Sequence, residues 1–209
     1  MVDFDTEQER FWFGEFGDSY TDRNKGNELI CGNISLLSSI FKHTGSVDSL
    51  IEFGSNRGLN LMAIRSLLPT IELAAVEINP KAISMLQKLD IPVYQESILN
   101  FTPDYPRDFV LSKGLLIHIN PEMLSRAYDV LYESSRKYIC LVEYYSRVPV
   151  EIEYRGHKGV LFKRDFAGEL MDRFHDLELI SYGFVYYRDR HFPQDDPTWF
   201  LLEKKLNQQ

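Results

Sequence analysis

Cysteine is scarce in this chain: Cys31 and Cys140 are the only two cysteines among 209 residues. They lie far apart and inside apolar patterns, and they lack the paired spacing that is typical of a zinc site or a redox motif. We therefore expect two buried, reduced thiols and no bound metal.

Long apolar runs and an excess of positive charge are also missing. Charged residues interrupt each apolar run well before the roughly eighteen residues that a membrane-spanning helix requires, and no basic-then-apolar leader opens the chain. The net charge of −8 disfavours partners that present a phosphate backbone. These absences predict a soluble, cytoplasmic protein that binds neither membranes nor nucleic acid.

What is present is the composition of a globular protein, with 44% hydrophobic and 26% charged residues. The length suits a single domain. Apolar positions at helical spacing between residues 29 and 41 predict an amphipathic helix that ends near Gly45. We therefore expect an N-terminal helical lid segment, residues 1–45, and a core, residues 46–209.

Strands and helices alternate through most of the core, which predicts parallel strands joined by crossover helices. Strands are expected at 48–54, 72–78, 92–97, 107–114 and 138–145, with helices at 59–68, 80–89 and 121–135 between them. Residues 148–165 alternate with period two around a glycine-containing turn, which predicts an inserted hairpin. Two final strands, 177–188 and 198–205, should be antiparallel. The predicted fold is α/β, with a seven-stranded mixed Rossmann-like sheet.

The clearest local signal is the turn after the first predicted strand, Glu52-Phe53-Gly54-Ser55-Asn56-Arg57-Gly58. Gly54 and Gly58 would let the backbone bend sharply and approach a ligand at the helix N-terminus. Glu77 ends the second strand, where nucleotide-binding α/β folds place an acid on the ribose hydroxyls. These positions predict a cofactor that contains a ribose.

The same turn separates two classes of cofactor. A dinucleotide turn normally reads G-x-G-x-x-G, whereas this turn has Asn56 in place of the central glycine and the acid Glu52 before the first one. Glu52 would repel a pyrophosphate but could help to hold an ammonium group, and Asn56 tolerates left-handed backbone. The pattern favours S-adenosylmethionine over a nicotinamide dinucleotide.

These features, with the antiparallel final strands, resemble the class I methyltransferases, which convert S-adenosylmethionine to S-adenosylhomocysteine. The resemblance implies that Glu96, Ser97 and Ile98 flank the adenine and that Ser112, Lys113 and Gly114 lie beside the methionine part of the cofactor. Ser55 and Ile78, which follow Gly54 and Glu77 in the chain, are also expected to bind the cofactor.

Three longer segments, 6–24, 109–124 and 141–172, are similar to the pseudaminic acid biosynthesis-associated methylases. The likeness covers nearly the whole chain. It implies a small, sugar-derived acceptor, such as a nonulosonic acid or a nucleotide sugar, and it carries over no catalytic residue.

Methyl transfer to a hydroxyl or amine requires alignment and a base that removes a proton. His118 follows the fourth strand and is our candidate base, with a structural role as the alternative. Tyr144 and Tyr145 end the fifth strand, where acceptors bind in this architecture. Because consecutive strand residues face opposite ways, we expect Tyr144 and its neighbours to differ in whether they face the pocket.

Large aromatic residues crowd the segment 9–24, which is unusual so close to a terminus. Trp12 and Tyr20 could form a lid over the cofactor, with Arg23 on the methionine carboxylate and Asp18 on the acceptor. Packing of these side chains against the core is the alternative interpretation.

Basic residues gather around the predicted hairpin. Arg147, Arg155 and His157 could bind an acidic sugar, a phosphate or a carboxylate, and an ordinary solvated hairpin is the alternative. Two rival functions also stay open: a nicotinamide-dependent sugar oxidoreductase and a methyltransferase-like module without catalysis. The sequence makes no prediction of oligomeric state.

Overall fold

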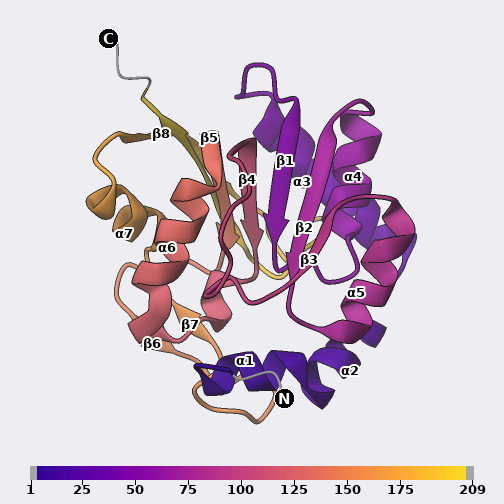
Figure 1. Cartoon of the computed structure of the whole chain (residues 1–209), viewed down its shortest axis with the longest axis vertical. Helices are drawn as coiled ribbons and strands as arrows, with labels where there is room; N and C mark the ends of the chain where they lie inside the picture. Colours follow the sequence, from indigo (N-terminus) through magenta and orange to yellow (C-terminus); the bar gives the residue numbers. More distant parts are fainter. Residues whose placement is uncertain (1–3, 206–209) are drawn as a thin grey trace.

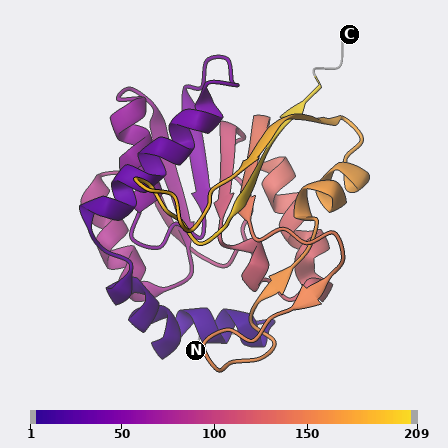
Figure 2. The same ribbon diagram turned by 180° about the vertical axis from the view of Figure 1, so that it is seen from behind.

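The computed structural model describes residues 4–205, which form a seven-stranded sheet covered by helices on both faces (Figures 1 and 2). The strand order is β3-β2-β1-β4-β5-β9-β8. The strands are β1 (Ser49–Phe53), β2 (Glu72–Glu77), β3 (Val93–Gln95), β4 (Arg107–Lys113), β5 (Ser135–Glu143), β8 (Leu177–Phe184) and β9 (Thr198–Lys204). The prediction of a seven-stranded mixed α/β sheet is confirmed.

Strands β1 to β5 are parallel, and β9 runs antiparallel to both of its neighbours, β5 and β8. The loop between β8 and β9, residues 185–197, contains no helix that could carry the chain across the sheet, and the two strands pair as antiparallel neighbours. This confirms the predicted antiparallel end of the sheet.

Two of the core helices, α5 (Pro80–Leu86) and α7 (Phe166–Arg173), begin at a side chain that caps them. The other core helices are α3 (Asn27–Phe41), α4 (Leu59–Leu67) and α6 (Leu124–Glu133), with short 3₁₀ turns at Gln87–Leu89, Leu116–His118 and Pro121–Met123. At α5, Pro80 occupies the first helical position and the Asn79 side chain accepts a hydrogen bond from the Ala82 N–H. Both features stabilise a helix start.

Two hydrophobic layers sandwich the sheet. Because successive strand residues point to opposite faces, Ile51 packs on the α6 and α7 side while Leu50 packs on the α3 and α4 side. Leu37 and Ile40 from α3 are fully buried in the second layer. Each such side chain contributes about 1.5–3 kcal/mol of burial free energy, so α3 belongs to the sheet's cover.

The two cysteines differ. Cys140 in β5 is buried, as expected, but Cys31 is exposed. The apolar stripe of α3 runs through Leu36, Leu37 and Ile40, and Cys31 lies off that stripe. The prediction of a buried thiol is therefore wrong for Cys31.

The insertion after β5 is a hairpin with very short strands, β6 (Val150–Glu151) and β7 (Phe162–Lys163). Its tip is a tight turn in which the Tyr154 and His157 backbones exchange both hydrogen bonds. The predicted hairpin is thus present, but much of the alternating segment 148–165 is irregular.

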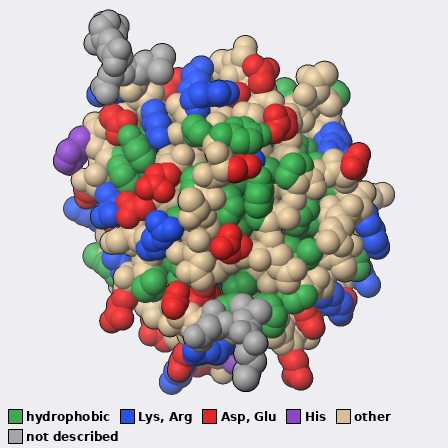
Figure 3. Space-filling view, in the orientation of Figure 1, with side chains coloured by type: hydrophobic (Ala, Val, Ile, Leu, Met, Phe, Trp, Pro, Cys, Tyr) green, Lys and Arg blue, Asp and Glu red, His purple; other side chains and the backbone are tan. Residues whose placement is uncertain are grey.

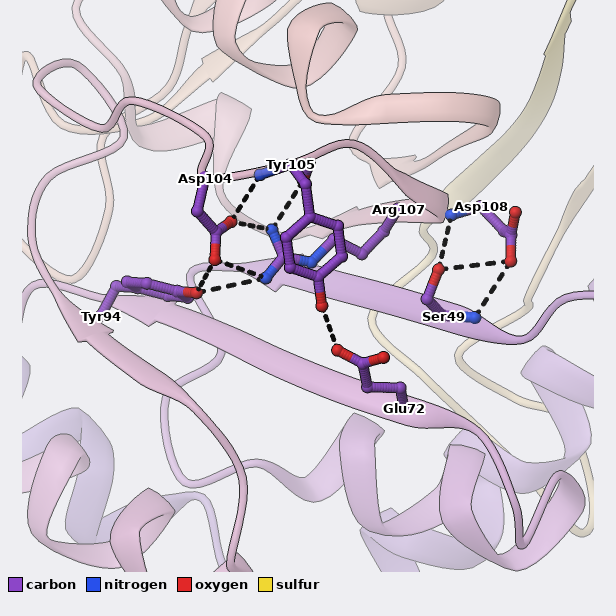
Figure 4. Close-up of polar contacts among 7 residues, drawn as sticks. All are labelled: Ser49, Glu72, Tyr94, Asp104, Tyr105, Arg107 and Asp108. Atoms are coloured by element: carbon purple, nitrogen blue, oxygen red, sulfur yellow. Dashed lines mark hydrogen bonds and ion pairs between the residues drawn. The ribbon is translucent and has the colours of Figure 1, made fainter.

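Figure 4 shows the amino edge of the sheet, where polar side chains bond to one another. The buried guanidinium of Arg107, at the start of β4, pairs with Asp104 and donates to the Tyr94 hydroxyl, 3.2 Å away. Nearby, the Asp108 carboxylate accepts from the Ser49 hydroxyl and backbone. The hydrogen bonds between Ser49 and Asp108 hold the first residues of β1 and β4 together.

No helix within residues 4–205 is long and apolar enough to cross a membrane. On the face seen in Figure 3, acidic and basic side chains are interspersed among apolar ones, without one dominant sign of charge.

Candidate functional site

The candidate site lies at the carboxyl edge of the parallel strands, opposite the network of Figure 4. Two N-terminal helices, α1 (Glu7–Phe13) and α2 (Glu15–Arg23), run across this edge (Figure 1). These two helices are called the lid helices below. Loops that follow parallel strands converge at this edge of an open α/β sheet, which is where such folds bind ligands.

The glycine turn after β1 has left-handed backbone at three positions: Gly54, Asn56 and Gly58, with φ of 71°, 45° and 77°. A Cβ atom at Gly58 would lie 2.5 Å from the Leu89 side chain, so only glycine fits there. Asparagine adopts this conformation more readily than most residues, and Asn56 does so here. The turn therefore forms without a central glycine.

The Glu77 carboxylate, at the end of β2, is hydrogen-bonded to this turn. One oxygen accepts from the Asn56 N–H at 2.7 Å and the other from the Asn79 N–H at 2.8 Å. Burial raises the pKa of Glu77, and these N–H donors counteract that rise. Each oxygen retains a second lone pair that can accept a hydroxyl.

The Glu52 carboxylate, at the end of β1, is fully buried and only half satisfied. Its Oε1 accepts from the Asn60 amide at 2.6 Å, while Oε2 has no partner. Burial raises the pKa of Glu52 to about 8. A buried carboxylate oxygen without a donor is costly, so this position is built for a cationic or donor ligand group.

A narrow cavity of about 100 Å³ lies between the lid helices and the ends of β2 and β3. Its wall contains four buried polar atoms without a hydrogen-bond partner: Gln8 Oε1, Glu9 Oε1, Trp12 Nε1 and Asn56 Oδ1. Native proteins rarely bury such atoms unpaired. A flat, polar heterocycle could satisfy these donors and acceptors.

A wide cavity of about 890 Å³ adjoins it, between α2, α3, the β6–β7 insertion and the β8–β9 loop. The two cavities share five lining residues, namely Tyr20, Gly54, Asn56, Gly114 and His118. The shared residues mark the junction of the two cavities, where a ligand in one cavity would meet a ligand in the other.

His118 lies at this junction in the 3₁₀ turn after β4. Its Nδ1 is 2.6 Å from the Val160 carbonyl oxygen, which can only accept, so Nδ1 carries the proton and Nε2 keeps a lone pair. The Trp12 ring lies 4.4 Å from the imidazole, centroid to centroid. Burial lowers the pKa of His118 to about 4, so the ring is neutral near pH 7.

Glu143, at the end of β5, positions the turn that carries His118. Its carboxylate accepts from the Ser112 hydroxyl at 2.9 Å and from the Leu115 and Leu116 N–H groups at 3.1 Å. Burial raises its pKa to about 7. Both Glu143 and Tyr144 line the wide cavity, because β5 ends at Glu143 and strand alternation stops there.

The lid helices are fastened to the core on one side of the cleft and to the insertion on the other. The Asn79 amide donates to the Trp12 carbonyl oxygen at 3.1 Å and to Asp18 at 2.9 Å. At the opposite end, the Gln8 amide donates to the Gly159 carbonyl oxygen at 2.7 Å. The lid therefore bridges the cleft from α5 to the β6–β7 hairpin (Figures 1 and 2).

Most of the residues expected from the sequence gather at this cleft. Around the narrow cavity lie Trp12, Tyr20, Gly54, Asn56, Glu77, Ile78, Glu96, Ser97, Ile98, Gly114 and His118, and around the wide one lie Arg23, Ser55, Lys113, Tyr144 and Arg155.

Seven of the expected residues do not line either cavity, and two of them are fully buried, namely Glu52 near the end of β1 and Ser112 in β4. Asp18 is bound to Asn79 in the lid, Gly58 packs under the turn, and His157 packs on Phe11 and Phe16. The other two are Tyr145, which is exposed and packs on Phe200, and Arg147, which is exposed. Sequence reasoning missed Asn79 and gave Glu143 no role, because the hydrogen bonds of both reach segments distant in sequence.

No protein-family model and no curated protein sequence matches this chain. Solved structures do resemble it. The magnesium protoporphyrin IX methyltransferase from Synechocystis PCC 6803, with bound S-adenosylmethionine, is 10% identical, with a TM-score of 0.67 over 98% of this chain and 100% of that one.

Two further structures are similar. The Burkholderia thailandensis 1,6-didemethyltoxoflavin-N1-methyltransferase, with bound S-adenosylhomocysteine, is 14% identical, with a TM-score of 0.67 over 98% of this chain and 94% of that one. An amino pentose methyltransferase from Micromonospora echinaspora is 10% identical, with a TM-score of 0.61 over 92% and 98%. This chain therefore has the class I methyltransferase fold.

Proposed function

We propose that this protein is a methyltransferase that uses S-adenosylmethionine to methylate a small, sugar-derived acceptor in the cytoplasm. One observation carries the proposal: a narrow cavity with unpaired polar atoms meets a wide cavity at Gly114 and His118. Such an arrangement lets one cavity hold the donor and the other the acceptor, with the reacting atoms at the junction.

The residues present fit this cofactor. Glu77 has lone pairs for the ribose hydroxyls, and the Trp12 indole N–H is a donor for a ring nitrogen of the adenine. The unpaired Oε2 of Glu52 suits the ammonium of the methionine part. When bound, this cofactor would supply an electrophilic methyl group, with S-adenosylhomocysteine as the leaving group.

The chain's own groups then align the acceptor and handle its proton. The neutral imidazole of His118 offers its Nε2 lone pair at the junction, where it can accept a hydrogen bond from an acceptor hydroxyl or amine. Tyr144, at the wall of the wide cavity, has its pKa raised by burial and keeps its proton, so it acts as a donor. The lid excludes water.

Two observations support a sugar-derived acceptor, one from the sequence and one from a structure of similar fold. Three segments of the sequence resemble methylases associated with pseudaminic acid biosynthesis, and one structure of similar fold is an amino pentose methyltransferase. The wide cavity has room for a sugar ring.

Calorimetry with S-adenosylhomocysteine tests the cofactor, and mass spectrometry of a sugar panel incubated with methyl-labelled S-adenosylmethionine tests the transfer. We expect micromolar binding to the wild type and labelled product with at least one sugar. No binding of either form of the cofactor would overturn the proposal. NADH binding would favour an oxidoreductase, and cofactor binding without turnover on the panel would favour a binding module.

A further inference from the structure

The tip of the β6–β7 insertion has a backbone that does not suit its sequence. Arg155 and Gly156 occupy the two central positions of the turn, with φ of 51° and 83°. Positive φ at both positions defines a type I′ hairpin turn, in which asparagine or glycine is strongly preferred first. Arginine there is strained, because side chains with a Cβ atom rarely adopt left-handed backbone.

This strained arginine lines the wide cavity, beside Tyr154. Its guanidinium carbon lies 5.7 Å from the centre of the Tyr154 ring, which steers the side chain along the cavity wall. The next residue but one, His157, packs instead against Phe11 of the lid. The turn thus directs one side chain to the lid and one to the cavity.

The wide cavity also gathers positive charge in a chain whose net charge is −8. Its charged lining consists of Arg23, Arg57, Lys113 and Arg155 and of the acids Glu28, Glu143 and Asp195, with His191 also present. Glu143 is occupied by Ser112 and backbone N–H groups, and Lys113 lies close enough to Glu52 and Asp195 to feel their charges.

Arg155 and Arg23 lack, within the described part of the chain, the charged and polar partners that Glu143 and Lys113 have. Among residues 4–205 neither forms an ion pair or a side-chain hydrogen bond, and each guanidinium lies near aromatic rings, that of Arg23 being 5.6 Å from Phe16. Both are at the wall of the cavity that opens onto the junction with His118. Two unpaired guanidinium groups in the lining of one cavity are suited to bind an anion.

We propose that Arg155 is a specificity-determining residue that selects an acceptor bearing an anionic group, a carboxylate or a phosphate, with Arg23 as the second cation. The inference rests on the proposed function and narrows its acceptor class. The strain at Arg155 persists because the turn places a forked, charged donor where asparagine, the better turn residue, would place only a short amide.

The test uses the wild type and three variants, all saturated with S-adenosylhomocysteine. Arg155→Asn keeps the turn and removes the guanidinium, Arg155→Lys keeps the charge without the fork, and Arg147→Asn is the matched control outside both cavities. The probes are N-acetylneuraminic acid for a carboxylate, glucose 1-phosphate for a phosphate and N-acetylglucosamine as the neutral sugar. Binding is measured by calorimetry or ligand-observed NMR.

We expect the wild type to bind at least one anionic probe about tenfold more tightly than the neutral sugar. Arg155→Asn should abolish this preference, Arg155→Lys should retain part of it and Arg147→Asn should retain all of it. The anion that binds identifies the source of the charge. Equal binding of neutral and anionic sugars, an unchanged preference in Arg155→Asn, or no anion binding at millimolar concentration would overturn the assignment.

The affinity for S-adenosylhomocysteine separates this inference from the proposed function. Arg155→Asn should leave that affinity unchanged, because Arg155 does not line the narrow cavity. If the wild type failed to bind the cofactor, the methyltransferase proposal would fall, while the same probes added to the cofactor-free protein would still report whether Arg155 binds anions.

Discussion

The two edges of the sheet handle buried polar groups in opposite ways. At the amino edge, Arg107, Asp104 and Tyr94 bond to one another (Figure 4), whereas the carboxyl edge leaves many groups without partners. Of the buried side-chain polar atoms that lack a partner within residues 4–205, six lie around the cleft and two, in Arg107 and Ser134, near the amino edge.

This difference separates stability from binding. A mostly paired polar network at one edge fixes the strands, because most of its groups satisfy one another. Unpaired groups at the other edge lower stability and raise the affinity for a ligand that pairs with them. Variants at the amino edge should therefore change unfolding, and variants at the cleft should change binding.

The largest effect is expected from removing the lid. Deleting residues 1–24 removes Gln8, Glu9 and Trp12 from the narrow cavity and opens it to water, so binding of S-adenosylhomocysteine should be lost. Calorimetry measures the binding, and circular dichroism checks that the core stays folded. A truncated, folded protein that binds the cofactor normally would show that the lid does not form the site.

The next effect belongs to the amino edge. Arg107→Met removes a side chain that is only 1% exposed, so Asp104 loses its cationic partner and the Tyr94 hydroxyl loses a donor. We expect a loss of about 2 to 4 kcal/mol of unfolding free energy, below the range for fully buried pairs because the Asp104 side chain is 44% exposed. Urea unfolding measures this loss.

The same variant tests whether the two edges are independent. Arg107→Met should bind S-adenosylhomocysteine as the wild type does, because Arg107 lies at the opposite end of its strand from Gly114. A parallel loss of affinity would mean that the amino-edge network also shapes the cleft.

A smaller effect is expected from Glu77→Gln in the cleft. The amide keeps one acceptor oxygen, so it loses one of the hydrogen bonds from the Asn56 and Asn79 N–H groups and part of the acceptor capacity for the ribose, and affinity should fall by about 1 to 3 kcal/mol. The matched control is Glu133→Gln, on exposed surface at the end of α6. Calorimetry should show the loss for Glu77 only, and an unchanged affinity would remove Glu77 from the cofactor site.

The sequence predicted the sheet well because local patterns encode it. Pro80 and Pro121 open their helices at or near the expected positions, and the glycine turn has the predicted left-handed Asn56. The cleft was predictable where a residue lies at the carboxyl end of a strand, as Glu77 does. Its position depends only on the strand that it ends.

Contacts between distant segments were not predictable. Asn79 looks like an ordinary helix cap, and only the fold shows that its amide also holds the lid at Asp18. From the sequence, Arg147 and Arg155 are both arginines near the hairpin and have the same predicted role. In the structure, the left-handed turn brings only Arg155 to a cavity. Side-chain direction in an irregular loop depends on dihedral angles that no periodicity encodes.

The smallest predicted effect concerns pH and Glu52. The unfolded chain releases the Glu52 proton near pH 4.5, whereas the folded protein holds it until about pH 8, mainly because the carboxyl is buried. Between these values the unfolded state binds fewer protons, so the contribution of Glu52 to stability falls as the pH rises. Asn60 and Lys113 favour the ionised form, and Glu77 disfavours it.

Glu52→Gln removes this titration and keeps the size of the side chain. We expect the variant to gain about 1 kcal/mol over the wild type between pH 5 and pH 7. Urea unfolding of both proteins at the two pH values isolates the contribution of Glu52 to the unfolding free energy, since all other groups titrate alike in the two proteins. The variant should also bind S-adenosylmethionine more weakly, because the unpaired oxygen that destabilises the empty cleft is the one offered to the ammonium. A stability difference that is the same at both pH values would show that Glu52 is already ionised at pH 5.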